Sequence, residues 1–113
     1  MPIKERFDEL SSQIRNGEMP DKPSVVYQFI HFGHQWALSQ PEVSDKRVIY
    51  ERMFHTLLDT ICDPLIESHW RHTCLDNIHQ PLNNIHKLAR TCCECRHAHE
   101  LHHEVSVTSQ YFL

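Results

Sequence analysis

Cysteine and histidine are concentrated near the end of the chain, between Cys92 and His103. Seven of these twelve residues are Cys or His, the side chains that zinc and related transition metals favour as ligands. A helix turns by about 100° per residue, so one of its faces would carry a continuous series: Ile85, Leu88, Cys92, Cys95, His99 and His103. The pattern predicts a metal site on the last helix.

Chelating pairs recur on this face. Cys95 and His99 are one helical turn apart, and so are His99 and His103; side chains at i and i+4 project together. Cys92 and Cys95 have the related i, i+3 spacing. One straight helix usually offers two ligands to one ion, whereas a closed zinc site takes four.

The first ligands are expected to be Cys95 and His99, because they continue the apolar face of the same helix. Both side chains should therefore point toward the protein. By contrast, Cys93, His97 and Glu100 should project from the opposite side, toward solvent or a partner.

The remaining ligands must come from another helix or another subunit. His69 and His72 belong to the preceding helical segment, which a turn at Pro81 joins to the last one. A site on a dimer axis, with the same pair from both chains, is equally compatible with the spacing.

No zinc-finger motif supports the metal hypothesis. In a zinc finger, a Cys-x2-Cys element is followed, after a finger-length spacer, by a second Cys-x2-Cys or by a His-x3-His element, and this sequence contains no such combination. The hypothesis depends on composition, with eleven His in 113 residues. The alternative is a polar helix end, exposed to solvent, whose histidines bind nothing.

Apolar residues recur at helical spacing in five segments: 3–16, 24 to about 40, 44 or 45 to about 62, 63 or 64 to about 79, and 81 to 104 or 105. Only two glycines occur, and Gly17 should end the first helix. We predict an all-α fold, an irregular bundle of four to five helices in a single domain spanning 1–113. Residues 1–23 would be an N-terminal helix and linker, and residues 106–113 a C-terminal tail.

The second segment, 24–40, is the most apolar and is expected to be the central helix. Trp36 and Trp70 lie on the apolar faces of their segments, so both should be substantially buried.

Charge and hydropathy argue against two kinds of partner. The eleven Lys and Arg are scattered and the net charge is −4, which disfavours a nucleic-acid surface. No stretch approaches the ~18 apolar residues of a membrane span. The charged start of the chain does not resemble a signal peptide, so we expect a cytoplasmic protein with reduced cysteines.

Arg90 and His97 form an Arg-x6-His pair near the end of an all-α chain. This arrangement, which covers eight residues, resembles that of the HEPN ribonucleases. The resemblance implies that Arg90 and His97 would act on RNA across a dimer.

We predict a small regulatory or protein-interaction module that forms homodimers and carries zinc, or another transition metal, between its last two helices. The sequence favours a non-enzymatic role. The alternatives are the HEPN-like ribonuclease and an inhibitor or immunity protein of phages or mobile elements, in which the Cys and His residues bind no metal.

Overall fold

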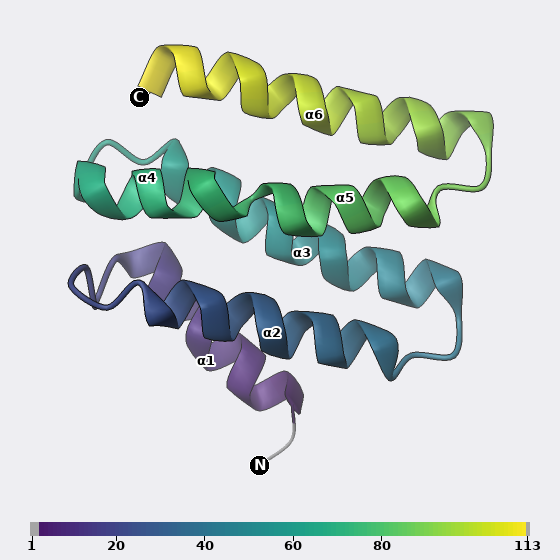
Figure 1. Ribbon diagram of the computed structural model, residues 1–113, viewed down its shortest axis with the longest axis horizontal. Helices are drawn as coiled ribbons and strands as arrows, with labels where there is room; N and C mark the ends of the chain where they lie inside the picture. The colour runs from purple at the N-terminus through teal and green to yellow at the C-terminus, as the bar shows by residue number, and fades with distance from the viewer. Residues whose placement is uncertain (1–2, 113) are drawn as a thin grey trace.

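The computed structural model describes residues 3–112, which form six α-helices and contain no strand (Figure 1). The helices are α1 (Ile3–Asn16), α2 (Ser24–Leu38), α3 (Val43–Ile61), α4 (Ser68–Asn77), α5 (His79–Leu88) and α6 (Cys92–Phe112). The prediction of an all-α bundle is confirmed. Only Ile78 separates α4 from α5, and the two run nearly in line. Pro81 has no N–H to donate to the carbonyl of Asn77, which interrupts the helix at this point.

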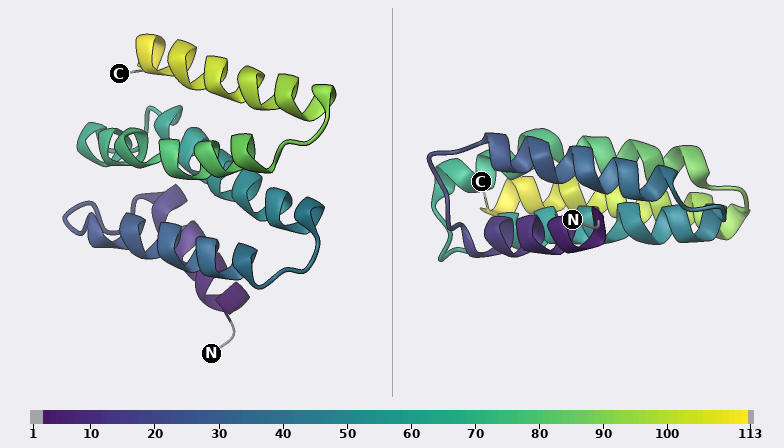
Figure 2. Two further views of the ribbon diagram at one scale, coloured as in Figure 1. Left: turned by 45° about the vertical axis from the view of Figure 1, so that its right-hand side comes forward. Right: turned by 90° about the horizontal axis from the view of Figure 1, so that it is seen from below.

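The molecule is a thin slab with dimensions of 37 × 37 × 15 Å. Figure 2 shows α2 and α5 in one layer and α1 and α3 in the other, with α6 along one edge. Helix α3 packs against each of the other helices, whereas α2 packs against α1, α3 and α4. The prediction that segment 24–40 is the central helix is therefore wrong, because burial on several sides depends on position in the slab more than on apolar content.

Two glycines permit close packing. Gly17 has φ of +61° and ends α1 as predicted, with the Gly17 and Glu18 N–H groups donating to the carbonyls of Ile14 and Gln13. Gly33 is buried where α2 crosses α3, and a Cβ at this position would lie 2.5 Å from the sulfur of Met53. A side chain there would require the Met53 side chain to move.

The two tryptophans differ in burial. Trp70 is fully buried, as predicted, and its indole N–H donates to the carbonyl of Ile14 at 3.0 Å, in the last turn of α1. Trp36 is only partly buried and lies against Phe7 and the Arg52 guanidinium.

Trp70→Ala should lower the free energy of unfolding by about 3–5 kcal/mol, because it leaves a cavity and removes one of the two hydrogen bonds that the Ile14 carbonyl accepts. Trp36→Ala should cost less, since its ring is already partly in solvent. Chemical denaturation of both variants measures the difference. An equal or larger cost at Trp36 would contradict the packing described here.

A buried arginine holds the ends of two helices. The Arg71 Nε donates to the carbonyl of Ile61 at 2.8 Å, and its NH2 group donates to the carbonyl of Phe112 at 2.7 Å. These carbonyls lie at the C-termini of α3 and α6, where a positive charge is favourable. The expectation of a separate tail at 106–113 is wrong for residues 106–112, which continue α6; Leu113 lies outside the described residues.

Arg15 and Asp63 connect α1 to the segment after α3, with 2.7 Å between the guanidinium and the carboxylate. The hydrogen bond from Arg15, and after it the N–H of Leu65, hold the pKa of Asp63 below its usual value. The stability that Asp63 contributes is therefore present above the unfolded-state pKa, about 3.9, and is lost as the pH falls through the lower folded-state pKa.

Asp63→Asn should lower the melting temperature at pH 7 and reduce the further loss of stability in acid. Thermal melts between neutral pH and acid measure both effects. Asp59→Asn is the matched control, since Asp59 is an exposed carboxylate of α3. Identical pH profiles for Asp63→Asn and the wild type would contradict the role of the ion pair.

Candidate metal site on helix α6

Helix α6 begins with a capping box formed by Thr91 and Glu94. The Glu94 N–H donates to the Thr91 hydroxyl at 3.1 Å, while the Glu94 carboxylate accepts the Arg90 N–H at 2.8 Å. Arg47 of α3 adds an ion pair to the same carboxylate at 2.7 Å. The Arg90 N–H and the Arg47 guanidinium lower the pKa of Glu94, so it accepts as a carboxylate.

The capping box separates α6 from α5. Helix α5 ends at Leu88, and Ala89 has extended backbone angles, with φ of −69° and ψ of 127°. The predicted continuous helix from Pro81 to Glu104 or Val105 is therefore wrong at 89–91. The Thr-x-x-Glu pattern at 91–94 is a sequence signal for this helix start, and the expectation of one long helix missed it.

Because the helix is interrupted at 89–91, the buried face of α6 is not a continuation of the buried face of α5. The buried residues of α6 are Ala98, Leu101 and Val105, which do not continue the line of Ile85 and Leu88. The prediction that Cys95 and His99 point toward the protein is wrong for Cys95, which is exposed; His99 is also exposed, but its ring lies beside that of His86 on α5. Burying apolar side chains is favourable, whereas burying an imidazole without a partner is costly, so the apolar residues form the packed face.

Every predicted ligand is on the surface: Cys92, Cys95, His99, His103, His69 and His72 are all exposed. Cys93 and Glu100 are exposed, as predicted. His97 is exposed but borders α3, with its Nε2 2.9 Å from the Glu51 carboxylate.

His69 and His72 are not near Cys95. They belong to α4, which lies beside the C-terminal half of α6 in Figure 1, while Cys95 is close to the other end. Within residues 3–112, no three His, Cys, Asp or Glu side chains are close enough to hold one metal ion. The site predicted between the last two helices of a single chain is therefore not assembled in the described part of the molecule.

The structure instead places His86 of α5 beside two imidazoles of α6, His99 and His102. We call these three the seam histidines; within residues 3–112 they do not form a three-ligand site for one ion. The His86 ring centroid is 5.3 Å from that of His99 and 6.2 Å from that of His102. Partial burial lowers the pKa of His86, and repulsion from His99 and His102 lowers it further. A lowered pKa favours the neutral imidazole, which is the form that binds metals.

The sequence prediction missed His86. Its approach to α6 depends on the turn at 89–91, which folds α6 back along α5. No periodicity within a single helix reveals a contact of this kind.

Arg90 and His97, the two residues whose spacing resembles that in the HEPN ribonucleases, do not lie on the same helix. Arg90 lies in the turn before α6, where its guanidinium is 3.4 Å from the carbonyl of Lys87. The Nε2 of His97 lies 2.9 Å from the Glu51 carboxylate of α3.

Comparison of the chain with protein-family models, curated proteins and solved structures gives no match. In the described residues, no helix is both long and apolar enough to cross a membrane.

Thr91→Ala should lower the free energy of unfolding by about 1 kcal/mol, because it removes the acceptor for the Glu94 N–H. Urea denaturation measures the change. Thr73→Ala is the matched control: the Thr73 hydroxyl bonds to the His69 carbonyl within α4, where alanine is the better helix former. If both variants have the same stability, the cap does not hold the start of α6.

Proposed function

We propose that this protein is a small regulatory module that associates with a second copy of itself by binding zinc, or a similar transition metal, on the exposed face of α6. The observation that carries the proposal is the pair Cys95 and His99, one turn apart and both exposed. Their side chains are available to a metal and to another molecule without any rearrangement of the core.

Ligand number favours a dimer. A closed zinc site has four ligands, and residues 3–112 of one chain bring no three suitable side chains together. Cys95 and His99 from each of two copies, related by a twofold axis, supply two thiolates and two imidazoles. Cys92 and His103, which are also exposed on α6, extend the same ligand set at either end.

The chemistry of the cysteines agrees with this role. All five cysteines are free thiols, and Cys92, Cys93 and Cys95 are exposed. A metal-binding thiol must stay reduced, so the proposal places the protein in the cytoplasm. Association that requires a metal would respond to the concentration of that metal, which is the sense in which the module is regulatory.

The competing arrangement uses the seam histidines. Two imidazoles bound to one tetrahedral zinc at about 2.0–2.1 Å place their ring centroids about 5 Å apart. His86 and His99 are already separated by 5.3 Å. A site of this kind would hold one metal per chain and would not require a second copy.

Zinc added to metal-free protein, purified without a histidine tag, should convert monomer to dimer with one ion per two chains. Light scattering gives the molar mass, and elemental analysis gives the stoichiometry. Cys95→Ser and His99→Ala should each abolish zinc binding and association. Cys93→Ser and His97→Ala are the matched controls, with the same substitutions at exposed positions on the same helix, and should preserve both.

Several outcomes overturn the proposal. One zinc per monomer that is lost in His86→Ala assigns the metal to the seam histidines. Loss of zinc in the control variants would mean that the helical face is wrongly chosen. No zinc binding by the wild type would leave an interaction module without a metal, as in the inhibitor or immunity-protein alternative.

A further inference from the structure

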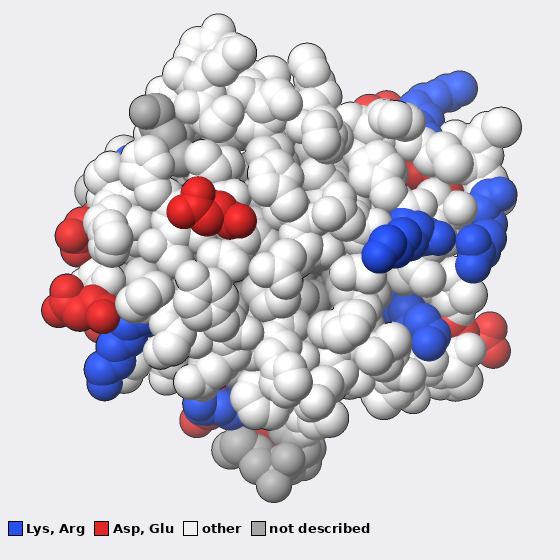
Figure 3. Space-filling view, in the orientation of Figure 1, with Lys and Arg blue, Asp and Glu red and all other residues white. Residues whose placement is uncertain are grey.

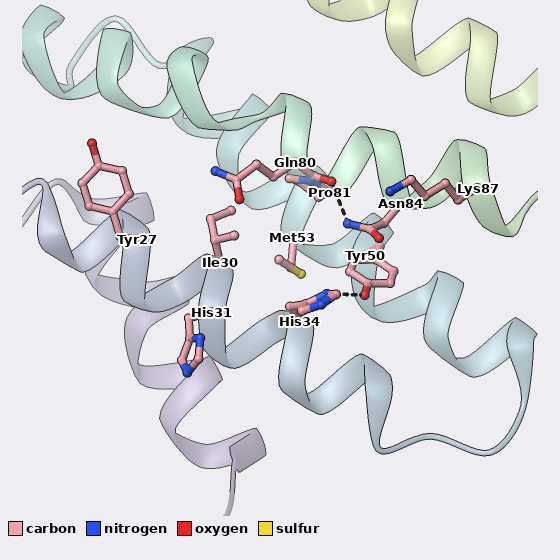
Figure 4. Close-up of a pocket in the computed structure, with 10 residues that line it drawn as sticks. All are labelled: Tyr27, Ile30, His31, His34, Tyr50, Met53, Gln80, Pro81, Asn84 and Lys87. Carbon is pink, nitrogen blue, oxygen red and sulfur yellow. Dashed lines mark hydrogen bonds between the residues drawn. The ribbon is translucent and has the colours of Figure 1, made fainter.

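A cavity of about 430 Å³ lies between α2, α3 and α5 (Figure 4). Its size falls in the range of about 300–1,000 Å³ that is typical of small-molecule sites. None of the residues lining it belongs to α6, so it is separate from the metal site proposed above.

The base of the cavity is apolar. Ile30, Met53 and Pro81 line it from three different helices, and all three are buried. A flat hydrocarbon ring placed against them would lose its contact with water, which is the usual source of affinity in such sites.

One wall carries a hydrogen-bonded pair. The hydroxyl of Tyr50 is 2.6 Å from the Nδ1 of His34, and Tyr50 is only 3% exposed. Burial raises the pKa of Tyr50, so its phenol stays protonated. If the phenol donates to Nδ1, the Nε2–H of a neutral His34 is free to donate; if Nδ1–H donates, the phenol O–H is free. In both tautomers the pair retains one donor for a ligand.

The residues that line the cavity include a positively charged side chain and no negatively charged one. Lys87 lines the cavity, while no Asp or Glu does. In Figure 4, Lys87 and Asn84 lie at the same end as His34 and Tyr50, and Tyr27 lies at the other end. Figure 3 shows Lys and Arg side chains to the right of the hollow between α2 and α5. A ligand with an anionic group at this end would meet a cation and hydrogen-bond donors.

We propose that the cavity binds a small aromatic carboxylate. The ring packs on Met53, Ile30 and Pro81, and the carboxylate faces Lys87 and the His34–Tyr50 pair. This arrangement separates an apolar base from a polar, positively charged end, as specific small-molecule sites do.

Indole-3-acetate is a suitable probe, with indole-3-acetamide and tryptamine as its neutral and cationic counterparts. Titration of the full chain, followed by two-dimensional NMR with a chelator present, should give saturable shifts centred on Tyr50 and Met53. The acetate should bind about tenfold more tightly than tryptamine, which corresponds to one charge-assisted hydrogen bond. The chelator makes the result independent of metal binding by α6.

Two variants test the assignment. Lys87→Gln should weaken binding of the acetate about tenfold, while Lys22→Gln, an exposed lysine of the α1–α2 linker, should not change it. Asn84→Trp fills the cavity from a half-buried position and should abolish the shifts. Equal affinity for acetate and tryptamine, equal effects of the two lysine variants, or the absence of saturable shifts would each overturn the proposal.

Discussion

The capping box at Thr91–Glu94 determines what the last third of this molecule presents to solvent. By accepting the Arg90 N–H and pairing with Arg47, the Glu94 carboxylate holds the start of α6 against α3. A helix that starts there buries Ala98, Leu101 and Val105. The Cys and His residues interleaved with them are then left on the surface, because a helix that packs on one side can bury only one stripe.

The far end of α6 is held by a different kind of contact. Arg71 bonds the terminal carbonyls of both α3 and α6, so one buried cation stabilises two helix C-termini. Helix α3 is therefore linked to α6 at both ends, through Arg47 and through Arg71. With only three buried residues in 21, α6 depends on these polar contacts more than helices α2 and α3 do.

The two proposed sites lie in different parts of the slab and rely on different physics. The metal site uses side chains that are exposed on an edge helix, where a second molecule can approach. The cavity between α2, α3 and α5 uses an apolar base and a polar end that three helices assemble. Gly33 lets α2 approach Met53 on α3 closely, and Met53 lines the base of the cavity.

The sequence by itself determined the helical class, the ends of α1 and the burial of Trp70. Helical periodicity, a glycine in the left-handed conformation at the end of a helix and large apolar side chains are local signals, and each acts within one segment. Only the tertiary structure decided the face of α6, the approach of His86 to His99 and the pairing of His34 with Tyr50. All three features depend on contacts between helices, and the contacting residues are 13 or more positions apart in the sequence. A small change in the direction of a helix, such as the one that the turn at 89–91 produces, moves its side chains between the core and solvent.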